Sequence, residues 1–165
     1  MANPNYLLTS IIVSIASYDS RVSDFSVYLY FILIYIYCDG ASRGNPGPAS
    51  IGVVAYRNSE STEVVFTISE KIGKETNNVA EWTALLFALQ KCKELSEKDI
   101  KIHLDSELVV RQMQGIYKTK NPELQKIKQQ VDSLKKDFSS IEFNHVPREK
   151  NKMADKLANQ ALDQK

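Results

Sequence analysis

Four acidic side chains lie where the sequence pattern predicts the end of a strand or the interior of a helix. They are Asp39, Glu81, Asp105 and Asp155. Carboxylates that meet at one place repel one another and raise one another's pKa, and a hard divalent cation removes that repulsion. Ligands that are all oxygen select Mg²⁺ or Mn²⁺. Two such ions about 4 Å apart can activate a water molecule and stabilise the leaving oxygen of a phosphodiester.

Each of these acids, taken alone, also has a structural interpretation. Asp39 precedes a glycine, and Asp-Gly is a common turn pair. Glu81 follows Asn78 by three residues, which is the spacing of a capping box. Asp105 can cap the helix predicted after it, and Asp155 can be an ordinary surface acid among lysines. The metal-site hypothesis therefore depends on whether the fold brings the four together.

The elements that would position these acids predict an α/β fold. Apolar and turn-forming residues predict strands over 33–39, 51–56 and 62–69, which can form an antiparallel meander. The later elements are a loop over 71–78, a helix over 79–94 with Trp82 in the core, a strand over 100–104, helices over 106–114 and from 122, a strand over 141–146 and a helix from about 150. Crossover helices make the later strands parallel, so we expect a mixed five-stranded sheet flanked by helices.

This topology predicts where the acids meet. The first and fourth strands would be parallel neighbours, so Asp39 and Asp105 would emerge side by side at their carboxyl ends. Open α/β sheets place ligands at that edge. Glu81, expected in the first turn of its helix, and Asp155, near the start of the last helix, can reach the same edge.

Four segments that contain these acids resemble the motifs of type 1 ribonuclease H, in that family's order and spacing. They are Tyr37–Pro48, Thr76–Glu81, Asp105–Val110 and His145–Asp155, and the resemblance runs from about residue 34 to the C-terminus. It is to the short form without the basic protrusion. The resemblance implies the ribonuclease H-like fold and hydrolysis of the RNA strand of RNA–DNA hybrids. It also implies a site for two Mg²⁺ ions, with Mn²⁺ as a substitute, built from the four acids.

The resemblance further implies a set of substrate contacts. Glycines and carboxamides in the two loops would lie in the minor groove of the hybrid, Thr76 would bind a phosphate of the DNA strand, and two residues would follow Asp105 into the groove. The groove and strand-end residues are Gly44, Asn45, Gly47, Asn77, Asn78, Ser106 and Glu107. Many relatives have glutamine in place of Glu107, and a further negative charge there would weaken the contact with RNA. Ordinary loop chemistry is the alternative for all of these positions.

Two histidines are present, His103 and His145, and no Ser–His–Asp or Cys–His arrangement accompanies them. His103 is expected to be structural because it falls in the middle of a strand. In many relatives a histidine in the loop before the last acid assists catalysis, and His145 fits that spacing. A subgroup with a Val-Pro-Arg-Glu pattern uses the arginine, which here is Arg148. If His145 ends its strand pointing inward, Arg148 takes the role; both remain candidates.

Composition and charge are those of an ordinary globular domain. The chain has 165 residues, 43% apolar and 25% charged, with a net charge of +1, so net charge alone does not indicate a nucleic-acid-binding protein. Residues 115–165 nevertheless carry 11 basic and 7 acidic side chains. Lysines 118, 120, 126, 128, 135 and 136 can partly replace the missing basic protrusion, or simply form a solvated helix face. Two cysteines without metal-ligand spacing indicate a reduced, cytoplasmic setting.

Residues 1–32 differ from the rest and are predicted to be an extension of uncertain order before a domain over 33–165. The uncharged stretch 25–38 is 14 residues long, short of the roughly 20 that a membrane helix needs. An anchor, a poorly ordered extension and a mis-assigned start all remain open, although membrane contact is not the expectation. The alternatives to a monomeric hybrid nuclease without an obligatory protein partner are a non-catalytic nucleic-acid-binding module, a membrane-tethered form and an enzyme that also cleaves double-stranded RNA.

Overall fold

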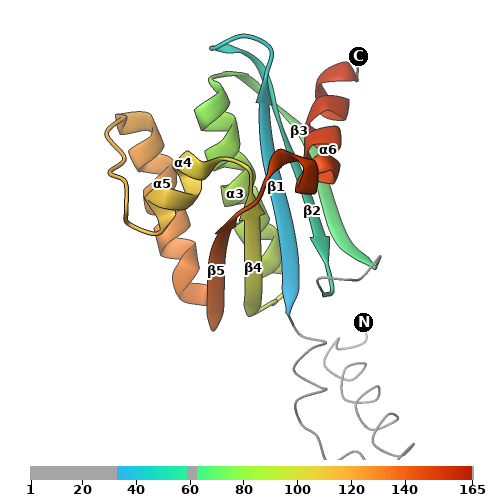
Figure 1. Ribbon diagram of the computed structural model, residues 1–165, viewed down its shortest axis with the longest axis vertical. Coiled ribbons are helices and arrows are strands. Elements are labelled where there is room, and N and C mark those ends of the chain that lie inside the picture. The colour runs from blue at the N-terminus through green and yellow to red at the C-terminus, as the bar shows by residue number, and fades with distance from the viewer. Residues whose placement is uncertain (1–32, 59–62, 165) are drawn as a thin grey trace, which may run out of the picture. The chain divides into compact units, whose positions relative to one another are not determined.

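A five-stranded mixed sheet forms the centre of the computed structural model, which describes residues 33–58 and 63–164. The strand order across the sheet is β3-β2-β1-β4-β5 (Figure 1). The strands are β1 (Ile34–Ser42), β2 (Gly47–Tyr56), β3 (Val64–Glu75), β4 (Asp99–Leu104) and β5 (Ser140–His145). The predicted mixed sheet of antiparallel and then parallel strands is confirmed. The predictions about residues 1–32 lie outside the described residues.

β1 is the central strand and links the two halves of the sheet. It pairs antiparallel with β2 and parallel with β4, and β4 pairs parallel with β5. Ile34, Ile36 and Cys38 are completely buried on one face of β1, while Tyr35 and Tyr37 lie half-buried on the other. This alternation follows from the two-residue period of a strand, and it places the main apolar core on the first of these faces.

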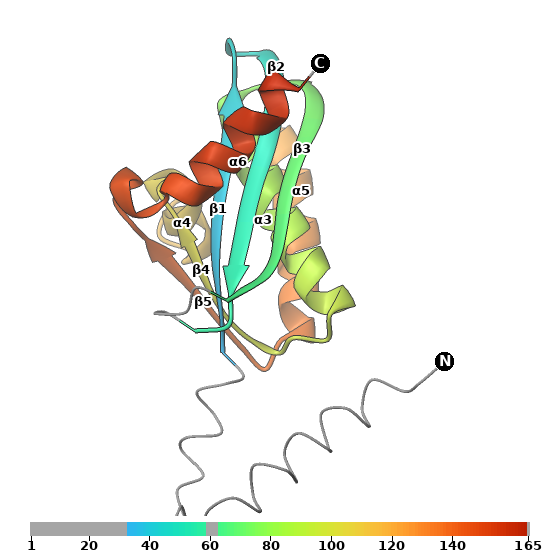
Figure 2. The ribbon, with the colours of Figure 1, turned by 90° about the vertical axis from the view of Figure 1, so that its right-hand side faces the viewer.

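Helices cover both faces of the sheet, which gives three layers (Figure 2). α3 (Asn77–Glu94) packs on β1 and β2, with α5 (Pro122–Leu134) against it, and Trp82 is fully buried in the core as predicted. α6 (Lys152–Asp163) crosses the opposite face over β2. The shorter elements are α4 (Glu107–Met113), η1 (Lys135–Asp137) and η2 (Arg148–Lys150). Among the helices of residues 33–58 and 63–164, none has the length and apolar character needed to cross a bilayer.

The hairpin between β1 and β2 and the strand after it are longer than the sequence indicates. β1 continues past Asp39 to Ser42, so the prediction that Asp39 ends the strand is wrong. The loop predicted over 71–78 is also wrong over its first part, because β3 extends to Glu75. The reason is pairing with the early part of β2, in which Gly47 lies opposite Glu75. Gly73, whose φ is +93°, lies at the irregular register that this extension contains.

α3 begins two residues earlier than predicted, at Asn77, and Thr76 is its N-cap. The Thr76 hydroxyl oxygen accepts a hydrogen bond from the Val79 backbone N–H at 3.3 Å. The capping box with Asn78, the alternative interpretation of Glu81, is therefore wrong, and so is the predicted placement of Glu81 in the first turn. Glu81 lies in the second turn of α3, so its carboxylate does not cap the helix.

Candidate active site

Three of the four predicted acids meet at one edge of the sheet. Asp39, Glu81 and Asp105 each offer a carboxylate oxygen, and these oxygens all lie within 4.8 Å of one another. The parallel pairing of β1 with β4 ends at Cys38 opposite Leu104, so the next residue of each strand emerges at the same place. The predicted convergence of Asp39 with Asp105 is confirmed, and it follows from the strand register.

Glu81 reaches this edge because α3 lies directly against β1. A Cβ atom added at Gly40 would lie 2.2 Å from the Glu81 backbone nitrogen and 2.2 Å from the Ala80 carbonyl carbon. Only a glycine allows the helix backbone to approach the strand so closely. The residue next to Gly40 is Asp39, and the approach therefore places the Glu81 carboxylate beside that of Asp39.

Burial and mutual repulsion leave this cluster poorly suited to full ionisation without a cation. Burial, followed by the charges of Asp105 and Asp155, raises the pKa of Asp39 from 3.8 to about 7. Burial, followed by Asp39 and Asp105, raises the pKa of Glu81 well above its ordinary value. Among the described residues the buried Glu81 Oε2 has no hydrogen-bond partner. An oxygen-only cluster with an orphaned buried acceptor fits a hard divalent cation, which would replace the protons.

Asp155 lies beside the cluster rather than within its tightest part. It occupies the first turn of α6, and its Oδ1 accepts a hydrogen bond from Arg148 Nη2 at 2.6 Å. Its charge contributes to the raised pKa of Asp39, but it is not one of the three acids whose oxygens lie within 4.8 Å. Asp155 is thus electrostatically coupled to the site, which an ordinary surface acid would not be, and its role as a ligand stays a prediction.

Arg148 and His145 occupy different positions with respect to the acids. Arg148 pairs with Asp155, and its positive charge offsets part of the rise in the pKa of Asp39 and of Glu81. His145 is exposed at the end of β5, so it does not point inward as a structural histidine would. Arg148 is in direct contact with one of the four acids, and the part that either residue plays in catalysis stays a prediction. His103 stacks on Tyr37 with ring centroids 4.7 Å apart, in agreement with a structural role.

A hydrogen bond joins the two loops that contain the predicted groove residues. Asn45, at the tip of the β1–β2 hairpin, accepts a hydrogen bond through Oδ1 from the Asn77 backbone N–H at 3.2 Å. The Ser42 hydroxyl donates to the Glu75 carbonyl oxygen at 2.8 Å and ties the base of the hairpin to the end of β3. The Gly44–Gly47 tip and the start of α3 therefore form one surface, although they lie far apart in the sequence.

Asp105 does not cap α4, so the structural interpretation offered for this acid is wrong. The N-cap of α4 is Ser106, which makes no side-chain capping bond, and Asp105 is not the cap. Glu107 is exposed in the first turn and pairs with Arg111 at 3.3 Å. This ion pair partly offsets the negative charge expected to disturb contact with RNA.

Comparison with known proteins agrees with this geometry. The family model described as "Reverse transcriptase-like" matches residues 37–161. The crystal structure of RNase H1 from the halophilic archaeon Halobacterium salinarum is 40% identical, with a TM-score of 0.76 over 79% of this chain and 98% of that one. The chain belongs to the ribonuclease H family. The family resemblance predicted from the four motifs is thereby confirmed.

Other members of the ribonuclease H family give similar matches. LC11-RNase H1, crystallised in complex with an RNA/DNA hybrid, is 43% identical, with a TM-score of 0.74 over 79% of this chain and 96% of that one. The bifunctional protein Rv2228c of Mycobacterium tuberculosis is 42% identical over 130 residues, which are 79% of this chain. The chain spans only about a third of the length of that protein, 35%, and 64% of the Ribonuclease HI of Halobacterium salinarum.

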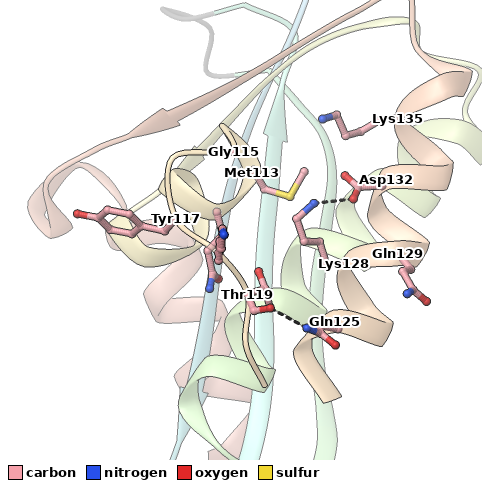
Figure 3. A pocket seen from close by; sticks show the side chains of 11 residues that line it. Met113, Gly115, Tyr117, Thr119, Gln125, Lys128, Gln129, Asp132 and Lys135 are labelled. Carbon is pink, nitrogen blue, oxygen red and sulfur yellow. Dashed lines mark hydrogen bonds and ion pairs between the residues drawn. The ribbon is translucent and has the colours of Figure 1, made fainter. Parts of the chain in front are cut away.

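A groove of about 630 Å³ lies between α4, the loop that follows it and α5 (Figure 3). Three of the six lysines predicted to replace the family's basic protrusion line it, namely Lys118, Lys128 and Lys135, which we call the groove lysines. Lys128 pairs with Asp132 at 2.5 Å, and the Lys135 ammonium stands 5.4 Å from the centre of the Phe143 ring. The groove therefore carries a net positive charge, and one of its two helices, α4, begins two residues after Asp105.

One residue in contact with the acids was missed by the sequence analysis. Asn151 is buried, and its side-chain amide donates hydrogen bonds to Asp105 and to the Cys38 carbonyl oxygen. The available signal was a polar residue four positions before Asp155 inside a motif that resembles the family. The local sequence pattern predicts only that such an asparagine begins a helix. Its hydrogen-bond partners, Cys38 and Asp105, are far away in the sequence and are brought to it by the fold.

Proposed function

We propose that this chain is an endoribonuclease that hydrolyses the RNA strand of RNA–DNA hybrids, using Mg²⁺ or, in its place, Mn²⁺. The observation that carries the proposal is the buried cluster of Asp39, Glu81 and Asp105, with carboxylate oxygens within 4.8 Å of one another. The crystal structure of the related LC11-RNase H1 with an RNA/DNA hybrid supports the substrate class. Residues 33–165 would form the catalytic domain, acting as a monomer without an obligatory protein partner.

Different residues of the chain would bind the cations and assist the transfer of charge and protons during hydrolysis. Asp39, Glu81 and Asp105, with Asp155 beside them, would hold two divalent cations. Bound there, the cations supply Lewis acidity and activate the attacking water. Arg148 donates a hydrogen bond to the Asp155 carboxylate at 2.6 Å, and it would add positive charge close to the cleaved phosphate. His145, exposed at the end of β5, is the second candidate for proton transfer at the leaving oxygen.

The surface formed by the hairpin tip and the start of α3 would recognise the hybrid. Carboxamides of Asn45, Asn77 and Asn78 offer donors and acceptors to 2′-hydroxyls and base edges, and the glycines of the tip let the backbone approach the groove. Readout of 2′-hydroxyls and groove shape distinguishes an RNA strand from DNA without reading a base sequence. Thr76 is proposed to bind a DNA-strand phosphate, and Ser106 and Glu107 to face the RNA strand.

The test is a cleavage assay on an RNA–DNA hybrid, double-stranded RNA and double-stranded DNA of one sequence, each with Mg²⁺, with Mn²⁺ and with a chelator. We expect cleavage of the RNA strand of the hybrid only when metal is present. Binding of the hybrid without cleavage under any condition would indicate a non-catalytic module instead. Cleavage of double-stranded RNA at a comparable rate would widen the substrate class.

The groove lysines give a prediction about affinity. Replacing all three with alanine should weaken hybrid binding and lower the slope of log K against log salt by about 0.9 for each phosphate that the variant no longer binds. Fluorescence anisotropy at several salt concentrations, in a chain made inactive by Asp39→Asn, measures both quantities. The matched control removes the same charge elsewhere. It replaces with alanine three lysines at or just beyond the C-terminal end of α3, namely Lys91, Lys93 and Lys98. Equal slopes for the two triple variants would contradict the prediction.

A further inference from the structure

We propose that Asn151 is a positioning residue that fixes the acids of the site relative to one another; the inference rests on the proposed function. The residue is only 1% exposed, between the end of η2 and the start of α6. Its Nδ2 donates one hydrogen bond to Asp105 Oδ1 and another to the Cys38 carbonyl oxygen, both at 2.9 Å. Cys38 immediately precedes Asp39 within β1, and Asp105 immediately follows β4, so one amide group links the two strands at the positions of their acids.

The backbone of Asn151 extends the same link to α6. Its carbonyl oxygen accepts a hydrogen bond from the Asp155 N–H at 3.1 Å, and its own N–H donates to the Arg148 carbonyl oxygen at 2.9 Å. Arg148 in turn holds the Asp155 carboxylate. Three of the four acids are thus connected through one residue that is itself neither charged nor exposed.

The orientation of the Asn151 amide follows from the chemistry of its partners. The Cys38 carbonyl oxygen accepts hydrogen bonds and donates none, so only the NH₂ end of the amide can face it. The Oδ1 end is buried and has no donor partner among the residues that the structure describes. An unpaired buried acceptor costs free energy, so this asparagine is poorly explained by stability alone.

Loss of the Asn151 amide should weaken the affinity of the site for Mg²⁺. Without it, the Asp105 carboxylate is no longer linked to the Cys38 carbonyl group of β1, and the distance between Asp39 and Asp105 is less tightly fixed. Groups that orient metal ligands typically change metal affinity or activity by about 10- to 100-fold when removed. A residue that only stabilised the start of α6 would lower the melting temperature and leave the cation affinity of the folded protein unchanged.

The experiment compares the full chain with Asn151→Ala, Asn151→Ser and the control Gln160→Glu, which changes an exposed amide on the same helix. Isothermal titration calorimetry measures the Mg²⁺ dissociation constant, thermal unfolding in a chelator measures the melting temperature, and a hybrid-cleavage assay measures kcat and KM. For Asn151→Ala we expect Mg²⁺ affinity and kcat to fall by about 10- to 100-fold with little change in KM. Asn151→Ser should lose less, because its hydroxyl can replace one of the two donors.

The outcomes separate this inference from the proposed function. Mg²⁺ affinity and kcat of both variants within two-fold of the parent chain would overturn the positioning role, whatever happens to the melting temperature. If the alanine variant does not fold, the serine variant decides alone by the same two measurements. A parent chain that binds Mg²⁺ but cleaves no hybrid would overturn the proposed function, and calorimetry would still decide whether Asn151 fixes the acids.

Discussion

Asp39→Asn should reduce hydrolysis of an RNA–DNA hybrid by at least about a thousand-fold while the fold remains intact. Asp39 is the acid that all the others surround, since Glu81, Asp105 and Asp155 each interact with it. An amide cannot supply the negative charge that a divalent cation needs, and loss of about 4 kcal/mol of transition-state stabilisation corresponds to that factor. Single-turnover cleavage in saturating Mg²⁺ measures the effect, and the control is Asp99→Asn, at the opposite end of β4 from Asp105.

The same variant should be more stable than the parent chain when metal is absent. The pKa of Asp39 is about 7 in the folded protein against 3.8 ordinarily, so between pH 4 and 7 the folded state keeps a proton that the unfolded state has released. Stability of the metal-free parent chain therefore falls as pH rises through this window, by up to about 4 kcal/mol for this group. An asparagine side chain has no such proton, so Asp39→Asn should remove this part of the pH dependence.

Thermal unfolding in a chelator at several pH values between 4 and 8 checks this second effect. We expect the melting temperature of Asp39→Asn to exceed that of the parent chain most at pH 7 to 8. Addition of Mg²⁺ should raise the melting temperature of the parent chain more than that of the variant, because a cation stabilises the state that binds it. Full cleavage activity in Asp39→Asn would refute the assignment of the site.

Gly52→Ala is expected to destabilise the fold by several kcal/mol and to reduce cleavage at the same time. A Cβ atom at Gly52 would lie 2.1 Å from the Ala154 carbonyl oxygen and 2.5 Å from the Ala158 backbone nitrogen. Both are backbone atoms of α6, so no side chain can move aside and the helix itself must lift from β2. Overpacking of this kind typically costs about 1–3 kcal/mol and occasionally more.

The loss of activity has a separate cause from the loss of stability. α6 carries Asp155, and Asn151 lies directly before its first residue, so a helix displaced from the sheet moves both away from β1. Urea unfolding and hybrid cleavage at a temperature where the variant is folded measure the two effects. The control is Gly73→Asn, at a glycine with open space around it and a φ of +93°, which should cost about 1–2 kcal/mol through backbone strain and leave α6 in place. A Gly52→Ala chain as stable and active as the parent would contradict the packing described for α6.

Local sequence pattern determined the type and order of the elements and the identity of the acids. Alternating apolar residues over 34–38 predicted the central strand, and the apolar helix that contains Trp82 was predicted to within two residues of its observed start. The meeting of Asp39 with Asp105 was also predictable, because it needs only that the first and fourth strands pair in parallel, although β1 itself continues past Asp39. These features depend on contacts between residues close in sequence or on topology alone.

Only the tertiary structure determined the features that depend on the register between strands or on the close approach of a helix to a strand. β3 continues to Glu75 because its hydrogen-bonding partners lie at the start of β2, and the turn-like residues 71–75 carry no local sign of this. Glu81 reaches the acids because α3 touches β1 at Gly40, and Asn151 joins residues that are 46 and 113 positions away in the chain. Such contacts are set by the packing of whole elements, which no window of neighbouring residues contains.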